Sequence, residues 1–173
     1  MSRQIVHAPL TEPNLEPLMT DTIESRLSAR SIVLPEAAAP AANYLPYVIT
    51  GSLLFISGQL PMENGAIAVK GLLGRDVELA SGQRAAELCA INILAQAKAA
   101  LGGDLSRIAR VVKLSGFVAS DPSFTDQHLV INGASNLIAE VLGEAGKHAR
   151  AAVGMACLPL NAAVEIDAVI EIR

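Results

Sequence analysis

The sequence ARAAVGMACLPLNAAVEIDAVIEI, residues 149–172, predicts two β-strands separated by a proline-containing turn. Successive side chains of a strand point to opposite faces, so every second residue shares a face. In the final strand, predicted for residues 163–172, one face is wholly apolar, and we expect it to meet the helices. The opposite face carries three acidic side chains, Glu165, Asp167 and Glu171.

The preceding strand, predicted for residues 148–158, places Arg150 on one face with only small neighbours, Ala152, Gly154 and Ala156. Small side chains let a ligand or another subunit approach the sheet closely, and a guanidinium suits a carboxylate. We expect this face to carry Glu165 as well. The alternative is an ordinary exposed face with a solvated arginine. Three roles stay open for Glu165: a catalytic acid, an ion-pair partner of Arg150, or a solvated side chain.

Upstream, the pattern predicts an α+β domain with the order βββαβαββ, in which two helices cover one face of a mixed sheet. Residues 47–50 and 53–57 predict a hairpin around Gly51-Ser52, a type II′ turn signature. A third strand is expected at residues 66–69. Apolar residues at three- and four-residue spacing predict a long helix at 78–101. A strand follows at 107–119, and Asp121-Pro122 predicts the start of the second long helix.

The first part of the chain has a different character from the rest. Residues 1–20 contain three prolines and no periodicity, which is typical of an extended arm. Residues 21–30 predict a short helix capped by Asp21 or Thr22. Prolines at 35, 40 and 46 predict an extended connector. We therefore divide the chain into an N-terminal arm with a short helix, residues 1–41, and a compact domain, residues 42–173.

Composition excludes several classes of protein. The 173 residues are 51% hydrophobic, so the chain is not disordered as a whole, and 17% charged. A net charge of −4 and 3% aromatic residues give no reason to expect binding to nucleic acid. No apolar run is long enough for a membrane helix, and the N-terminus lacks a secretory signal. Two cysteines fit a reducing cytoplasm. The low charge suggests that a partner covers some apolar surface.

The histidines and cysteines predict no metal site. His7, His128 and His148 have no metal-ligand spacing with one another or with the cysteines. Cys89 and Cys157 are expected to be buried structural thiols. His128 is expected on an exposed helix face, whereas His148, two residues before Arg150, is an alternative lining residue of a cleft.

The motifs in their order resemble those of the YjgF/RidA family. They are FISGQLP at Phe55–Pro61, a long alanine-rich helix, and the Ala149–Ile172 stretch. The resemblance covers residues 44–173 and implies a chorismate-mutase-like fold. It also implies a homotrimer whose sheets form a central barrel, with ligand clefts between subunits. Family members hydrolyse enamine and imine acids such as 2-aminoacrylate to keto acids and ammonia, with no metal or organic cofactor.

The resemblance also implies site residues. Arg150 resembles the arginine that holds the substrate carboxylate, and Glu165 the glutamate that positions or activates water. Substrate-binding positions are those that resemble a tyrosine near the first strand, the glycine of the SGQ motif and a helix asparagine: Tyr47, Gly58 and Asn132. Ala152 departs from the family, because many deaminases have a cysteine there, although its backbone remains able to bind ligand. With the altered INGASN segment, this indicates a divergent subgroup with an N-terminal extension.

Two functions follow as expectations. The first is a cytoplasmic, trimeric imine or enamine hydrolase that uses Arg150 and Glu165 on a small carboxylate-bearing substrate. The second is a non-catalytic trimeric protein that binds a small carboxylate and regulates a partner, which the alanine at position 152 favours. A third activity known in the family, ribonuclease, is disfavoured by the acidic charge balance.

Overall fold

The computed structural model describes residues 21–39 and 42–173, so residues 1–20 of the expected arm lie outside the described part. The main element is a five-stranded mixed sheet with the strand order β1-β2-β7-β5-β6. Every neighbouring pair is antiparallel except β5 and β6, which run parallel. The strands are β1 (Tyr47–Thr50), β2 (Leu53–Gln59), β5 (Ile108–Ala119), β6 (Ala149–Met155) and β7 (Val164–Ile172).

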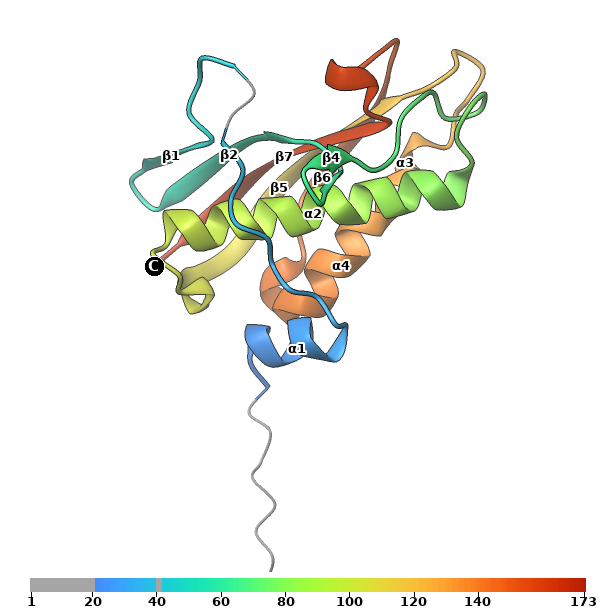
Figure 1. Ribbon diagram of the computed structural model, residues 1–173. Helices are drawn as coiled ribbons and strands as arrows, with labels where there is room; N and C mark the ends of the chain where they lie inside the picture. The colour runs from blue at the N-terminus through green and yellow to red at the C-terminus, as the bar shows by residue number, and fades with distance from the viewer. Residues whose placement is uncertain (1–20, 40–41) are drawn as a thin grey trace, which may run out of the picture.

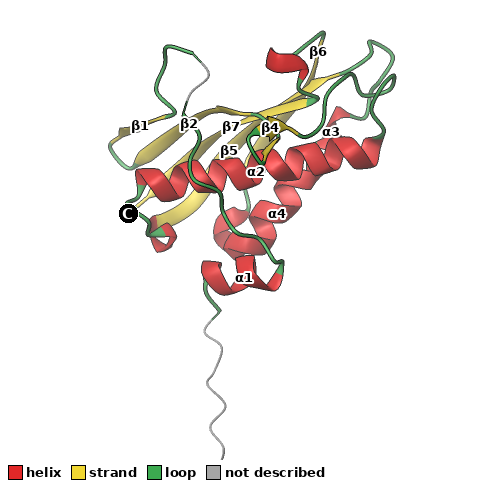
Figure 2. Ribbon diagram, viewed as in Figure 1, coloured by secondary structure: helices red, strands yellow, loops and turns green. Residues whose placement is uncertain are grey.

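Helices cover one face of this sheet (Figure 1). They are α2 (Leu79–Ala100) and α4 (Asn132–Leu142), with the one-turn α3 (Gln127–Val130) before α4. Figure 2 shows the two layers, with the helices together on one side of the strands. The predicted mixed α+β architecture is therefore confirmed. The helix-facing side of β7 is buried as expected: Val164, Ile166, Ala168, Ile170 and Ile172.

The hairpin of β1 and β2 forms where it was predicted. Tyr47 pairs with Ile56 and Thr50 with Leu53, which leaves Gly51 and Ser52 as the two turn residues. Gly51 has φ +56°, a left-handed conformation that glycine adopts without a steric penalty. Positive φ at the first turn position and not at the second matches the expected type II′ geometry.

Two upstream elements differ from the prediction. The strand expected at 66–69 is only Ala66–Ile67 (β4), and it pairs with Met62–Glu63 (β3) as a separate two-stranded hairpin outside the main sheet. The second long helix does not begin at Asp121-Pro122. The Asp121 carboxylate instead accepts hydrogen bonds from the backbone and hydroxyl of Ser123, which closes a turn ahead of α3. An aspartate can satisfy a turn as well as a helix start, so the local signal was ambiguous.

The long helix α2 buries the predicted stripe of small and apolar residues. Gln96 is a polar residue of this helix and does not belong to the apolar pattern, yet it is only 2% exposed. Its side-chain amide donates a hydrogen bond to the backbone oxygen of Ala38, 2.7 Å away. The connector that follows α1 runs across α2 (Figure 1), and the hydrogen bond to Ala38 joins Gln96 to this connector.

The predicted short helix of the N-terminal segment forms as α1 (Ile23–Ala29), with Thr22 as its cap. Leu27 is buried in the same core as the domain. Arg26 donates a hydrogen bond to the backbone oxygen of Val141 near the C-terminal end of α4. Arg30 forms ion pairs with Glu87 of α2 and Glu140 of α4. These contacts hold α1 against the outer side of the helical layer.

Candidate functional site

Arg150, on edge strand β6, is the centre of a polar cluster with α3 and α4. Its Nη1 donates hydrogen bonds to Oδ1 of Asn132 and to Oγ of Ser135, each 3.0 Å away. Its Nη2 donates to the backbone oxygen of His128, also at 3.0 Å. Two predicted site residues, Arg150 and Asn132, are thus brought into contact. Among the described residues, no acceptor contacts the Nε of Arg150, which leaves part of the guanidinium available.

The expected common face of Arg150 and Glu165 is wrong. Arg150 is paired in register with Leu114, a fully buried residue, so its side chain leaves the sheet on the helix-facing side. Glu165 is paired with Phe117, which is paired in turn with the exposed Val153. These residues lie on the open face of the sheet, which is the face that the helices do not cover. Since register partners point to the same side of a sheet, the two residues lie on opposite faces, and an ion pair within one chain is excluded.

The small residues near Arg150 accommodate helices of the same chain. Ala152 is paired with Gly116 and packs against the core. It therefore lies on the same helix-facing side of the sheet as Arg150, which is paired with Leu114. A Cβ at Gly116 would stand 2.5 Å from a side-chain carbon of Ile131, the residue between α3 and α4. The alternation predicted for β6 is correct, but the prediction of which half meets the helices is wrong. The half that contains Arg150 faces the helices, and the more apolar half, which includes Val153 and Met155, is the exposed one.

Glu165 and Gly58 form the second cluster of predicted residues, on the open face of the sheet. The carboxylate of Glu165 lies directly against the Cα of Gly58, in space that any side chain at position 58 would fill. Burial raises the pKa of the Glu165 carboxyl above its ordinary value, and the nearby Asp167 raises it further. Glu165 therefore keeps a proton to higher pH than a solvated glutamate would, which suits a group that handles protons.

Tyr47 joins neither cluster within one chain. It lies on β1, at the edge of the sheet opposite to β6, and its register partner Ile56 is buried. Four strand spacings separate the two edges, which is about 19 Å across the sheet. Tyr47 and Arg150 can therefore contribute to one site only if a second copy of the chain supplies one of them.

Cavities accompany both clusters. An open cavity of ≈370 Å³ is lined by Arg150, Ser135 and His148, together with Asn136 and Lys147. Gly58 lines a smaller cavity of ≈120 Å³ beside Tyr44. A third cavity of ≈700 Å³ lies between α2 and the connector after α1 and contains none of the predicted site residues.

The sequence prediction missed Ser135, and it named His148 only as an alternative lining residue. Ser135 Oγ lies 3.0 Å from Nε2 of His148, and Nδ1 of His148 lies 2.6 Å from the backbone oxygen of Gly146. The signal available for Ser135 was its position in INGASN, one helical turn after Asn132. No pattern in the sequence links the serine to a histidine thirteen residues later.

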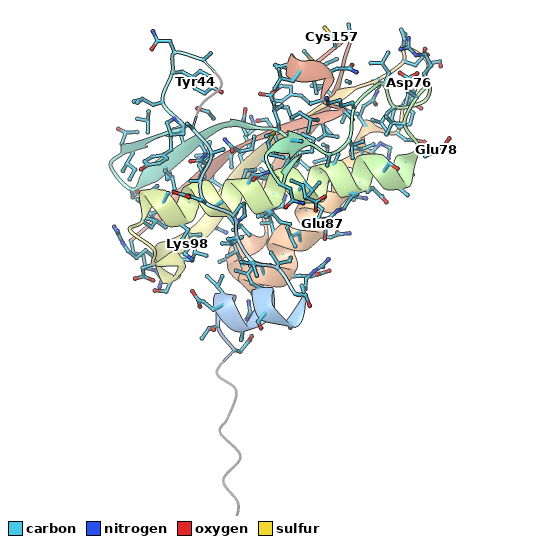
Figure 3. The ribbon with its side chains drawn as sticks, in the orientation of Figure 1. Tyr44, Asp76, Glu78, Glu87, Lys98 and Cys157 are labelled. Atoms are coloured by element: carbon cyan, nitrogen blue, oxygen red, sulfur yellow. The ribbon has the colours of Figure 1, made fainter. Side chains whose placement is uncertain are left out.

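The two cysteines have different environments. Cys89 is buried as predicted, burial raises the pKa of its thiol, and its Sγ contacts the backbone oxygen of Val164. Cys157, predicted to be buried, is exposed, because β6 ends at Met155 and Cys157 lies in the loop that follows (Figure 3). His128 is exposed, as predicted.

Metal sites and membrane-spanning helices were considered only for the described residues, which are 21–39 and 42–173. No group of three or more His, Cys, Asp or Glu side chains there is placed to hold a metal ion. In the same residues, no helix has the length and apolar character required to cross a membrane.

The chain is similar to several known proteins. Protein TCP17 of Trypanosoma cruzi is 51% identical over 152 residues, which are 87% of this chain and 94% of that protein. The crystal structure of protein Atu1372 from Agrobacterium tumefaciens is 69% identical, with a TM-score of 0.84 over 90% of this chain and 95% of that one. TdcF of E. coli, solved with bound serine, is 25% identical, with a TM-score of 0.54 over 80% of this chain and 92% of that one.

The family comparison covers most of the chain. Residues 24–172 match the model described as "YjgF/chorismate mutase-like, putative endoribonuclease". The match includes α1 as well as the two predicted clusters, and the expected chorismate-mutase-like fold is confirmed with it. The chain belongs to the YjgF/RidA family.

Proposed function

We propose that this protein is a cofactor-independent hydrolase of small carboxylic acids that carry an imine or enamine. The observation that carries the proposal is the hydrogen bonding of the Arg150 guanidinium. Its guanidinium is oriented by Asn132, Ser135 and the backbone of His128, while no described acceptor contacts its Nε. A planar, pre-oriented guanidinium with a free donor is suited to a carboxylate. Arg150 therefore supports the carboxylate of the proposed substrate.

The relatives support the choice of ligand. TdcF of E. coli was solved with bound serine, a molecule with a carboxylate and a nitrogen on the adjacent carbon. A 2-imino acid carries its nitrogen at the same position. An anchored carboxylate would hold the C=N carbon at a fixed place beside the protein, and positioning of this kind accelerates the addition of water.

The proposed site is completed by a second copy of the chain. Arg150 and Glu165 lie on opposite faces of one sheet, so a Glu165 that positions water beside the substrate has to come from a neighbouring subunit. The open face of the sheet supports such an assembly, because it exposes Val48, Phe55 and Val153 to solvent in a single chain. We propose the homotrimer that the family resemblance implies, with clefts at the subunit boundaries.

A non-catalytic role is the second candidate, and Ala152 favours it. Many deaminases of the family have a cysteine at this position, whereas this chain offers only backbone groups there. In this alternative, a small carboxylate binds at Arg150 and is not converted. The free thiols of Cys89 and Cys157 are consistent with a cytoplasmic location for either role.

One experiment separates hydrolysis from binding. 2-Iminobutyrate is generated in situ, and the release of ammonia and 2-oxobutanoate is followed with the wild type, Arg150→Ala and Arg110→Ala. Arg110 is an exposed arginine of β5 and is the matched control. We expect acceleration by the wild type and the control but not by Arg150→Ala. No acceleration over background with several imino acids would contradict the hydrolase, and retained binding of 2-oxobutanoate would then favour the second candidate.

A further inference from the structure

Ser135, His148 and the backbone of Gly146 form a hydrogen-bonded chain with a defined direction. Nδ1 of His148 lies 2.6 Å from the carbonyl oxygen of Gly146, and a carbonyl oxygen only accepts, so Nδ1 carries the proton in the neutral ring. Nε2 then has a free lone pair. The hydroxyl of Ser135, 3.0 Å away, therefore donates to Nε2.

Ser135 Oγ also contacts the positively charged guanidinium of Arg150. Nη1 of Arg150 donates a hydrogen bond to this oxygen at 3.0 Å. The hydroxyl is thus held between a base that accepts its proton and a guanidinium that stabilises negative charge on its oxygen. The same combination of a hydroxyl, an adjacent histidine and a third group that orients the histidine is used to activate serine in enzymes.

The hydrogen-bonded residues Ser135 and His148 lie beside the proposed carboxylate anchor. Ser135, His148 and Arg150 line the same ≈370 Å³ cavity, although they come from α4, the segment before β6, and β6 itself. Glu165 lies on the opposite face of the sheet. Among the described residues that line this cavity, the Ser135–His148 pair is therefore suited to accept a proton beside the carboxylate anchor.

We propose that Ser135 and His148 form a proton relay that activates the water for addition to the C=N carbon of a substrate bound by Arg150. This inference rests on the proposed function, because it assigns the proton acceptor for that reaction. Ser135 contacts the attacking water, and His148 acts through Ser135. Glu165 of a neighbouring subunit keeps the role of positioning the water.

The proton balance of the relay closes without a co-reactant. The water oxygen bonds to the carbon of a protonated imine, and the electron pair of the C=N π bond moves to nitrogen. One water proton passes to Ser135 Oγ as the serine proton passes to Nε2 of His148. The relay then returns this proton to the nitrogen of the carbinolamine. The C–N bond breaks, ammonia leaves, and the hydroxyl loses its proton to ammonia, which gives the keto acid and ammonium.

The decisive variant is His148→Gln, because it removes the proton acceptor and leaves the three hydrogen-bond acceptors of Arg150 in place. The control is Glu144→Gln, an exposed residue of the 3-10 turn Gly143–Gly146 just before His148. We expect His148→Gln to lower kcat for 2-iminobutyrate at least about 100-fold, the range typical of general acid–base catalysis. KM and the affinity for 2-oxobutanoate are expected to stay within about twofold, and the control to match the wild type.

Ser135 provides an independent second test. Ser135→Thr keeps the hydroxyl and is expected to retain at least a tenth of the wild-type kcat, whereas Ser135→Ala is expected to lose kcat as His148→Gln does. Wild-type hydrolysis with kcat of His148→Gln within threefold of it would overturn the relay and leave the proposed function intact. A loss of 2-oxobutanoate binding in His148→Gln would also overturn the relay, because it would show a structural role. A wild type with no activity would overturn the proposed function, and the relay with it.

Discussion

The carboxylate of Glu165 on β7 occupies the space in which a Cβ at Gly58 of β2 would stand. Glycine is required at position 58 for this close approach and not for its backbone conformation, since its φ is not in the positive range. The family motif SGQ therefore has a physical meaning in this chain. Because its glycine has no Cβ, the Glu165 carboxylate is able to contact the backbone of β2.

Gly58→Ala is expected to displace the Glu165 carboxylate with little loss of stability. The atoms that clash with the new methyl group belong to the far end of a flexible side chain. The substitution should therefore lower the free energy of unfolding by about 1 kcal/mol, at the low end of the range for overpacking. If Glu165 positions water, imine hydrolysis should fall about as much as in Glu165→Gln. The check is to measure both variants by urea unfolding and by ammonia release. Full activity in Gly58→Ala would show that the position of this carboxylate is unimportant.

Much of the fold was predictable because one face of each element is buried. β7 alternates strictly, and its apolar half, Val164 to Ile172, has no competing assignment. The stripe of α2 was equally clear, but Gln96 was not, because a connector far away in the sequence covers it. Local patterns do not contain such long-range contacts.

The site was predictable in composition and not in arrangement. Alternation in β6 correctly grouped Arg150 with Ala152, yet alternation alone does not say which half meets the helices. The half with Val153 and Met155 is the more apolar one and is nevertheless exposed at the open face. Burial by a partner subunit would remove this conflict, so the wrong assignment and the proposed trimer have the same physical origin.

The stability contributed by Glu165 should depend on pH in the direction opposite to that of a paired carboxylate. Burial and Asp167 raise its pKa in the folded state, so between the unfolded and folded pKa values the folded state binds more protons. The glutamate therefore destabilises the fold progressively as the pH rises through that interval. The effect is absent below the unfolded pKa, near the ordinary value of 4.5.

Glu165→Gln removes this pH-dependent effect. The difference in unfolding free energy between Glu165→Gln and the wild type should become more favourable to the variant from pH 4 to pH 7. Comparison of the two proteins at each pH cancels the contributions of Asp76, Asp104 and Asp121, whose lowered pKa values act in the opposite direction. A difference that does not change with pH would contradict the raised pKa.

Phe55→Glu tests the open face of the sheet as a subunit interface. Phe55 is 41% exposed and is paired in register with Val48 on β1 and Val169 on β7. A buried charge without a partner is costly, so the variant should sediment as a monomer at micromolar concentration, where the wild type is expected to be a trimer. Val33→Glu is the control, because Val33 is also an exposed apolar residue but lies in the connector. A wild type that is a stable monomer would refute the trimer.

Leu27→Ala tests whether the N-terminal helix is part of the stable domain. A helix of seven residues is too short to persist alone, so α1 depends on its contacts with α4. Leu27 supplies the buried contact, and Arg26 adds a hydrogen bond to Val141. Removal of a buried leucine side chain should lower the unfolding free energy by about 2 kcal/mol, the low end of the range because α1 lies at the margin of the core.

The control for Leu27→Ala is Ser28→Ala, at the adjacent exposed position of the same helix. Because serine and alanine differ little in helix propensity at a solvated site, this variant should stay within about 0.5 kcal/mol of the wild type. Urea unfolding at one protein concentration measures both. If Leu27→Ala also fell within that limit, the boundary placed at residue 42 would stand as the start of the stable domain. A loss of about 2 kcal/mol would extend the cooperative unit to α1, in agreement with a family match that begins at residue 24.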